Sequence, residues 1–513
     1  MTETGYNIDE TLEIIGLNKK YFDKCLNTAE KLVNIKQYDL ASKYLDLLAK
    51  FSWGNLTGYY TNWKFESLLN RLGDSLPDNE AFQSRNDSSK FRILHVASDM
   101  PDTGGHTRLI MNWIRSDQEN THNVIVTRQE NNKAPEIIIK EFGLDVSIFH
   151  VLKRDSTFLQ KAAELRERSY QYDMIIMHLH PEDIIPVIAY SCKNIPPIAV
   201  MNVGDHQAWV GASVCDLLVQ FRDFLIPIDK ERRGILHQYY LPLSITSTEF
   251  TSHEKYIATR KEIGIAEDET LLLSTGIEYK FKPFGEYNFF ESVIKVLDKN
   301  KKAKLYIAGI SKESQLAKKY AHHQITYLGT VTDLYRYEDA CDISVEGFPW
   351  GGATAILQCA LKGKPIHLIY NPTLAHEFIP KDIFYYPENE KDWENELNKL
   401  IADKGYRTKT KDEQHVYLQT HYNPANWSNN VKKLYRVLSE RKHSVYQNEK
   451  SHSYIGRNEY YLFYIGYGLM GTNHFLHCYQ LPILSKIKHA SYLFNKPPGV
   501  RVGKRALLNF IFS

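Results

Sequence analysis

Two short stretches of the sequence have residues of the kind that hold phosphate groups in proteins. Gly351 and Gly352 precede an apolar helix expected over 353–362, where free backbone N–H groups and the helix dipole attract anions. Lys280 follows an apolar run expected to be a strand, and a lysine is a mobile point charge that suits a diphosphate. Glycines also occur in ordinary turns between a strand and a helix, so Gly351 and Gly352 alone leave both interpretations open.

Three histidines that follow predicted strands are candidates for the base that accepts a proton in a reaction. A neutral imidazole can accept the proton of an attacking hydroxyl, and Asp205 could hold the ring of His206 for that task. We therefore expect His206 to be the base or its immediate partner, with His106 and His180 as competitors. The alternative is that His206 only orients its loop. His178 and His180 have the spacing of a metal-ligand pair, but no third ligand is recognisable nearby, so no metal site is predicted.

The stretches around these residues alternate between strand and helix. Expected strands cover 91–97, 122–127, 146–151, 174–178 and 198–203 in the first half, and 271–276, 304–308, 325–329 and 341–345 in the second. Such alternation predicts an α/β protein with doubly wound parallel sheets. Because parallel strands end at one edge of a sheet, the histidines and the glycine turns are expected at such edges.

The segment from Asp342 to Pro365 resembles the donor-nucleotide loop of GT-B glycosyltransferases. Within that class it is most similar to peptide O-linked N-acetylglucosamine transferases and to bacterial cytoplasmic N-glycosyltransferases. Ala355 replaces the second Thr of the family loop, and Gln358 stands where retaining enzymes have their second Glu. The resemblance covers about residues 92–441. The residues that match the family motifs are Asp342, Gly351, Gly352, Ala353, Thr354, Gly363, Lys364 and Pro365, together with Tyr279, Lys280 and Pro283 in a Tyr-Lys-x-x-Pro turn.

The resemblance implies a GT-B fold, in which two Rossmann-like domains face a cleft and the second binds the nucleotide-sugar. It implies a metal-independent transfer of a sugar, of the hexosyltransferase class, to a hydroxyl or amide of a glycan, polysaccharide or protein. No cofactor is expected besides the co-substrate, for which a UDP-sugar is favoured. The residues expected at the site are Lys280, Gly351, Gly352, Ala353, Thr354, Gly276, Tyr327 and Glu346 for the donor, Gly104, Gly105, Arg108, His180 and Trp209 for the acceptor or cleft, and His206, Asp205 and His106 for catalysis.

Four regions are expected along the chain. Residues 1–90 form a helical extension and linker, 91–251 the acceptor-side domain, 252–441 the nucleotide-sugar domain, and 442–513 a basic, aromatic tail. The extension is expected to be a cap packed on the enzyme, and the alternative is one tetratricopeptide-like unit. The tail is expected to be a packed subdomain, and the alternative is a surface for an anionic membrane or a polymer acceptor.

Composition narrows the classes that this chain of 513 residues can belong to. With 43% hydrophobic and 24% charged residues it is expected to be globular, and its net charge of +2 predicts no affinity for nucleic acid. Six scattered cysteines and a polar, acidic N-terminus favour a cytoplasmic protein. The basic tail could contact the inner face of the membrane. Two alternatives remain open: a degenerate GT-B domain that binds or scaffolds, and a nucleotide-sugar epimerase.

Overall fold

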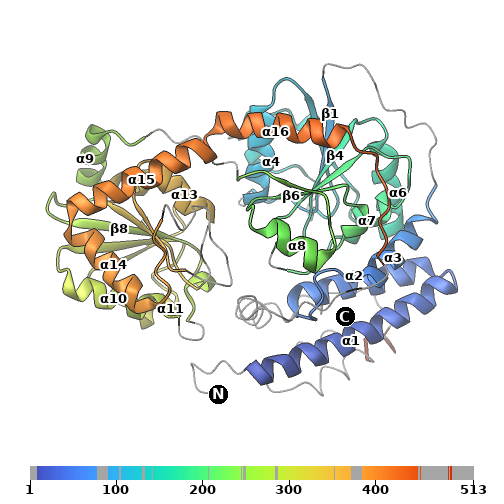
Figure 1. Cartoon of the computed structure of the whole chain (residues 1–513), viewed down its shortest axis with the longest axis horizontal. Coiled ribbons are helices and arrows are strands. Elements are labelled where there is room, and N and C mark those ends of the chain that lie inside the picture. The colour runs from blue at the N-terminus through green and yellow to red at the C-terminus, as the bar shows by residue number, and fades with distance from the viewer. Residues whose placement is uncertain are drawn as a thin grey trace. The chain divides into compact units, whose positions relative to one another are not determined.

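The computed structural model of the chain divides into two compact units (Figure 1). The first unit consists of Asn7–Leu241 with Ser428–Ser513, and the second has Pro242–Trp427 at its centre. The described residues are 8–77, 90–102, 105–129, 133–140, 142–205, 207–243, 245, 250–283, 287–349, 351, 353–370, 384–448, 451, 483–484 and 486–487. Most of the tail from residue 442 therefore lies outside them.

A parallel sheet of seven strands forms the centre of the first unit, in the order β3-β2-β1-β4-β5-β6-β7. The central strands β1, β4, β5 and β6 are almost wholly buried, as expected for a sheet covered on both faces, whereas the edge strands β3 and β7 are half-buried. The order reverses between β1 and β4, which is where ligands bind in doubly wound sheets. The bounds are β1 (Arg92–Ala97), β2 (Thr121–Val126), β3 (Phe149–Val151), β4 (Met174–His178), β5 (Ile198–Met201), β6 (Leu217–Gln220) and β7 (Gln238–Tyr240).

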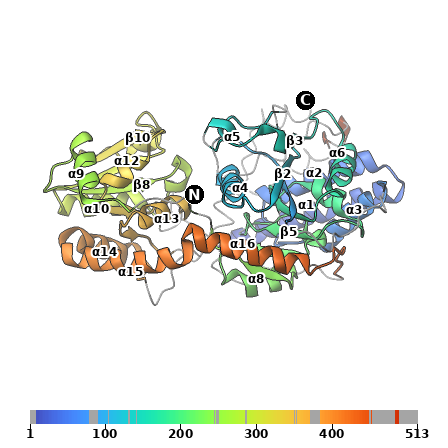
Figure 2. The ribbon, with the colours of Figure 1, turned by 90° about the horizontal axis from the view of Figure 1, so that it is seen from above.

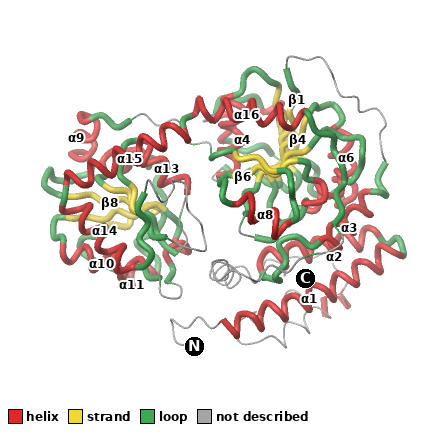
Figure 3. Tube along the Cα trace, in the orientation of Figure 1, coloured by secondary structure: helices red, strands yellow, loops and turns green. Residues whose placement is uncertain are grey.

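Helices cover both faces of this sheet, and Figure 3 shows the strands lying between them. On one face, α4 (Gly105–Ser116) packs its apolar residues onto those of β1 and β2. On the other, α6 (Phe158–Ser169) and α7 (Ile184–Tyr190) contribute to a larger core. Helix α6 begins at a capping box formed by Thr157 and Gln160. The unit also contains α5 (Ile137–Lys140) and α8 (Leu225–Arg233), and it includes most of α16 (Pro424–Ser439), which both views place beside α4 (Figures 1 and 2).

The N-terminal helices α1 (Ile8–Asn34), α2 (Tyr38–Gly54) and α3 (Trp63–Gly73) share the core of α6 and α7, so they form a cap on the sheet. Arg166 of α6 is buried and joins the cap to this helix, and among the described residues it has no carboxylate partner. Its guanidinium donates to backbone oxygens, including those of Gly73 at 2.9 Å and Ala189 at 2.6 Å. These oxygens lie at the C-terminal ends of α3 and α7, where a positive charge is favourable.

The second unit is a parallel sheet of five strands in the order β10-β9-β8-β11-β12, again with helices around it. Asp342 lies at the amino edge of this sheet, where it accepts hydrogen bonds from Arg260 at 2.7 Å and from the backbone N–H of Leu271 at 2.7 Å. The strands are β8 (Thr270–Thr275), β9 (Ala303–Ala308), β10 (Ile325–Gly329), β11 (Ile343–Val345) and β12 (Ile366–His367). The helices are α9 (His253–Glu262), α10 (Phe289–Lys299), α11 (Gln315–Lys319), α12 (Tyr335–Ala340), α13 (Ala353–Leu361), α14 (Glu390–Ala402) and α15 (Lys404–Tyr422).

The observed elements differ from the predicted ones in several places. The strand expected over 146–151 begins only at Phe149, because Asp145 caps a 3-10 turn over Val146–Ile148. The chain leaves the first unit after Leu241 rather than at 251, since Ile245 already packs in a core of the second unit. The strands β6, β7 and β12 and the helices α14 and α15 were not expected.

Candidate functional site

The carboxyl edge of the second sheet brings Lys280, Glu346 and Gly351 together. A 3-10 turn after β8, Glu278–Phe281, turns Lys280 back so that its Nζ donates to the carbonyl oxygen of Gly351 at 3.2 Å. Burial lowers the pKa of Lys280, and the negative charge of Glu346 opposes that shift. Glu346 follows β11 directly and is buried. The edge therefore holds a partly buried ammonium group next to the turn that leads into α13.

Close backbone packing fixes the position of Lys280. Gly309 has φ +104°, and a Cβ on it would lie 2.4 Å from the carbonyl oxygen of Gly276. A Cβ on Gly276 would in turn lie 3.0 Å from the ring of Phe281 and 3.3 Å from Cδ of Lys280. The stem of Lys280 thus packs against a glycine, and any larger residue at 276 would displace it.

Of the other residues expected to bind the donor, Ala353 and Thr354 lie at the start of α13, and Tyr327 lies in β10. Thr354 is exposed in the first turn of α13, a helix with no acidic residue in that turn, and Ala353 is its first residue. Tyr327 is half-buried, and its hydroxyl donates to the carbonyl oxygen of Tyr320 at 3.1 Å, so this side chain serves packing. Gly352 lies outside the described residues.

In the first unit, His180 lies after β4 between two carboxylates. Its Nδ1 is 3.4 Å from Glu182 Oε2, and its Nε2 is 3.4 Å from Asp99 Oδ1. The contact with Glu182 raises the pKa of His180 most, burial lowers it, and the charge of Asp99 adds to the rise. The His180 side chain is 36% exposed, so a ligand can reach it. Two carboxylates placed on either side of an imidazole stabilise its protonated form.

His106, in the first turn of α4, lies beside His180 with a ring-centroid separation of 6.3 Å. Burial and the charge of His180 lower the pKa of His106 to about 4. The two neighbouring imidazoles are therefore shifted in opposite directions, so that at neutral pH His106 is uncharged. Gly105 and Arg108 are exposed on the same turn, and Gly104 lies outside the described residues.

The loop after β5 is clamped by two buried arginines of α8. Arg233 donates to the carbonyl oxygens of Gln207 at 2.7 Å and Asp205 at 3.0 Å, and Arg232 also bonds to that of Asp205. The carboxylate of Asp205 forms an ion pair with Arg222. His206 itself lies outside the described residues, but the residues on each side of it are firmly held.

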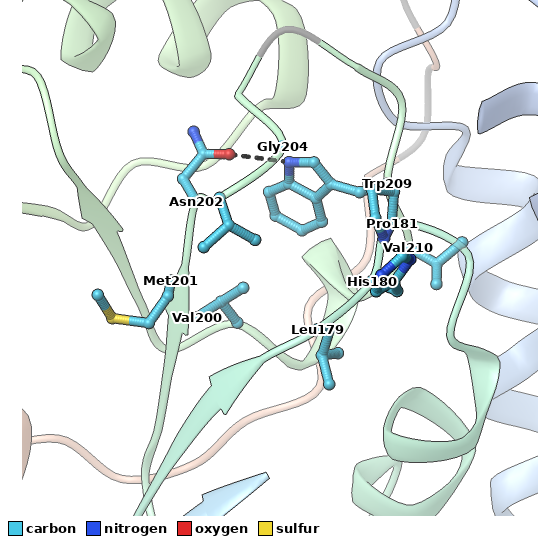
Figure 4. Close-up of a pocket in the computed structure, with 10 residues that line it drawn as sticks. Leu179, His180, Pro181, Val200, Met201, Asn202, Gly204, Trp209 and Val210 are labelled. Atoms are coloured by element: carbon cyan, nitrogen blue, oxygen red, sulfur yellow. Dashed lines mark hydrogen bonds between the residues drawn. The ribbon is translucent and has the colours of Figure 1, made fainter. Parts of the chain in front are cut away.

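Trp209 of this loop is buried rather than presented to a ligand. Its Nε1 donates to Asn202 Oδ1 at 3.2 Å, a contact that Figure 4 shows across the pocket between the ends of β4 and β5. The guanidinium of Arg233 lies 4.6 Å from its ring centroid. The pocket has an inner volume of about 10 Å³, which is comparable to one water molecule and too small for a sugar.

A buried glutamate of the N-terminal cap also holds this region, and its role was not predicted from the sequence. Glu66 of α3 accepts hydrogen bonds from the backbone N–H groups of Gly211 at 2.9 Å and Ser213 at 3.0 Å, and from the Ser213 hydroxyl at 2.7 Å. The sequence signal that could have revealed this role is the position of Glu66, which lies among the apolar residues on the buried side of an amphipathic helix.

Replacing Arg233 by methionine should destabilise the first unit by about 3 kcal/mol, because Asp229 loses one of its two buried cations and three carbonyl oxygens lose a donor. Urea unfolding of the full chain measures the change. Lys230→Met on the same helix is the matched control, since Lys230 is exposed. Equal stability of the two variants would contradict the clamp.

Among the side chains that the structure describes, no group of three or more His, Cys, Asp or Glu is arranged to hold a metal ion. None of the helices in the described ranges is both long and apolar enough to cross a membrane.

No protein-family model matches the chain, and no curated protein matches it either. Solved structures do match. Anabaena Alr3699/HepE in complex with UDP aligns at a TM-score of 0.53 and 12% identity, over 68% of this chain and 100% of its own. A glycosyltransferase from Rickettsia africae aligns at 0.51 and 11%, over 69% and 100%. Sucrose-phosphate synthase from Thermosynechococcus elongatus aligns at 0.50 and 12%, over 68% and 99%. The TM-scores show a shared fold, and at these identities the likeness shows the fold alone.

Proposed function

We propose that this chain, which has the GT-B fold, is a glycosyltransferase that moves a sugar from a nucleotide-sugar to an acceptor hydroxyl or amide. The observation that carries the proposal is the contact of Lys280 with Gly351 beside buried Glu346, at the carboxyl edge of the second sheet. A UDP-sugar is the favoured donor, since the HepE structures that match contain UDP and UDP-glucose. The acceptor is a glycan, polysaccharide or protein, and a hexose is the sugar expected.

Lys280 and the start of α13 supply the chemistry that a leaving diphosphate needs. As the glycosidic bond breaks, negative charge builds on the diphosphate, and an ammonium group with free helix N–H groups stabilises it. The partly buried position of Lys280 strengthens this interaction, because fewer water molecules screen it. We propose that these groups take the place of a metal ion in the reaction.

We propose that His180 accepts the proton of the acceptor group. Glu182 and Asp99 stabilise its conjugate acid and raise its pKa, whereas the pKa of His106 is lowered to about 4. A base works best when its pKa is close to the working pH. His206, the base expected from the sequence, remains the alternative to His180, and alanine variants of both residues decide between them.

A binding or scaffold protein is the second candidate, and Gln358 favours it. Its side chain lies 3.4 Å from Glu338 Oε2, within the packing of the second unit, so it supplies no second carboxylate to a donor site. Such a protein would bind the nucleotide-sugar without turning it over. An epimerase would convert the sugar while it is still joined to UDP.

A thermal-shift panel separates these functions. UDP, UDP-glucose and UDP-N-acetylglucosamine should raise the melting temperature, while ADP and GDP at the same concentration should not. At a hundred times its dissociation constant a ligand stabilises the fold by about 2.7 kcal/mol. Release of UDP from the sugar nucleotide that binds then identifies a transferase. Recovery of the bound sugar nucleotide unchanged identifies a scaffold, and recovery of a different sugar still joined to UDP identifies an epimerase. No shift with any nucleotide overturns the proposal.

Ending the chain after Ser451 should leave UDP binding unchanged, whereas ending it after Lys442 should destabilise the first unit. The segment between them is anchored: His443 Nδ1 lies 2.8 Å from Asp216 Oδ2, Tyr446 N–H bonds to Ser213 at 2.7 Å, and Ser451 Oγ accepts from Trp63 N–H at 2.6 Å. Isothermal calorimetry and thermal unfolding measure the two effects. Loss of UDP binding in the longer truncation product would show that the tail contributes to the donor site.

A further inference from the structure

The N-terminal cap reaches the carboxyl edge of the sheet in the first unit through α2. Trp53, in the last turn of that helix, lies beside His180 of the loop after β4, with ring centroids 5.9 Å apart and an interplanar angle of 69°. Such an edge-to-face arrangement is one that aromatic rings prefer. Trp53 is half-buried and the side chain of His180 is 36% exposed, so a ligand can reach both residues.

An arginine joins α2 to the loop after β4. Arg128, which follows β2, donates from Nη2 to Asp46 Oδ1 of α2 at 2.8 Å. The same guanidinium donates to the carbonyl oxygen of Glu182 at 3.1 Å and to Asp183 Oδ1 at 3.0 Å. Asp46 and Asp183 are both buried, so these ion pairs are little screened by water. Trp53 lies about two turns beyond Asp46 on the same helix, and Arg128 therefore fixes its place relative to the loop.

The sheet holds the same loop from the other side. Ser98, which follows β1, accepts a hydrogen bond from the backbone N–H of His180 at 2.9 Å and donates to Asp183 Oδ2 at 2.8 Å. Ser98 is buried as well. The cap and the ends of β1 and β2 therefore position this loop together.

The imidazole of His180 lies among two aromatic rings and two carboxylates. The rings are those of Trp53 and of His106, and the carboxylates of Asp99 and Glu182 are each 3.4 Å from one of its nitrogens. The side chain of Asp99 is 46% exposed, whereas that of Glu182 is 12% exposed. Asp99 can therefore accept hydrogen bonds from a ligand, next to the apolar ring of Trp53. Aromatic surface with a few placed polar groups is typical of sites for small molecules.

We propose that the N-terminal cap forms part of the acceptor site, in which a sugar ring of a glycan acceptor packs against Trp53. The inference rests on the proposed function, since it places the acceptor beside His180, the proposed base. A pyranose ring has an apolar face of C–H groups, which suits the indole, and hydroxyl groups at its rim, which suit the carboxylate of Asp99. Arg128 and Asp46 are positioning residues of this site, because they act through α2 and the loop after β4.

A printed glycan array, probed with the full chain, tests the role of Trp53. We expect binding to at least one glycan, and Trp53→Ala should weaken that binding about tenfold or more, as loss of an aromatic anchor does. Asp99→Asn should weaken it about fivefold, because a charge-assisted hydrogen bond becomes a neutral one. Tyr59→Ala is the matched control and should bind as the unaltered chain does, since Tyr59 is a half-buried aromatic residue of the same cap that packs on Phe22.

Three results overturn the proposal: no glycan bound by the unaltered chain, equal binding by Trp53→Ala and Tyr59→Ala, or binding to printed peptides but to no glycan. If circular dichroism shows that Trp53→Ala is unfolded, Asp99→Asn decides, and unchanged glycan binding in that variant overturns the proposal.

A separate assay keeps the site distinct from the proposed function. UDP affinity should be the same in the three variants, because we expect UDP to bind to the second unit. If the unaltered chain binds glycans through Trp53 but releases no UDP from any sugar nucleotide, the proposed function fails and the glycan site stands. If it releases UDP but binds no glycan, the site fails and the proposed function stands.

Discussion

Replacing Lys280 by alanine should weaken the binding of UDP by about 10- to 100-fold, because a charge-assisted hydrogen bond to the diphosphate is lost. The loss in turnover should be larger, since the charge on the leaving group grows as the bond to the sugar breaks. Isothermal calorimetry with UDP and the rate of UDP release measure the two effects separately. Gly351 keeps its backbone in the variant and loses only the contact with Nζ.

Lys282→Ala is the matched control for this prediction. Lys282 lies two residues away and is exposed, so its removal changes the net charge equally but should leave UDP affinity within about twofold. Thermal unfolding should be similar for both variants. Unchanged affinity and turnover in Lys280→Ala would remove this residue from the donor site, and equal losses in both variants would show only a general effect of charge.

Replacing His180 by alanine should lower the rate of transfer by about a hundredfold or more while donor affinity is kept. The base must be uncharged to accept a proton, so the rate should fall as the pH drops through the pKa of His180. That pKa is raised above its ordinary value by Glu182, and the decline should therefore begin above about pH 6.5. Glu182→Gln should move the decline to lower pH.

Three further alanine variants decide between the histidines. His206→Ala tests the base expected from the sequence, His106→Ala tests the neighbouring ring, and His237→Ala is an exposed control in the same unit. We expect His106→Ala to lose less rate than His180→Ala, and His237→Ala to lose none. A full loss in His206→Ala with near-normal turnover in His180→Ala would return the assignment to His206.

The GT-B fold could be predicted because its signals are local and repeated. Buried strands such as β4, which is bounded as expected at Met174–His178, read as apolar runs, and the glycine turn before α13 carries a family pattern. The predicted fold is confirmed by the two parallel sheets and the structures that match. The roles of Lys280, Glu346 and Gly351 stay predictions, although the structure brings these residues together.

The rest of the candidate site could not be predicted because it depends on pairing between distant segments. Glu66 and Gly211 are 145 positions apart, and nothing near either residue indicates the other. The contacts of His95 with His122 and His178 depend on the strand order, since they form only when β1 lies between β2 and β4. No role was predicted for Arg232 and Arg233, and only the fold shows that they hold the loop after β5.

The return of the chain through α16 sets an order for folding during synthesis. The five strands of the second sheet all lie within Pro242–Trp427, so they have all been made by the time residue 427 emerges from the ribosome. The sheet of the first unit is made earlier, but its packing is complete only after Tyr435 contacts Trp113 and Asp117 and His443 contacts Asp216. A nascent chain released before residue 451 would therefore carry a finished second unit and an incompletely packed first one.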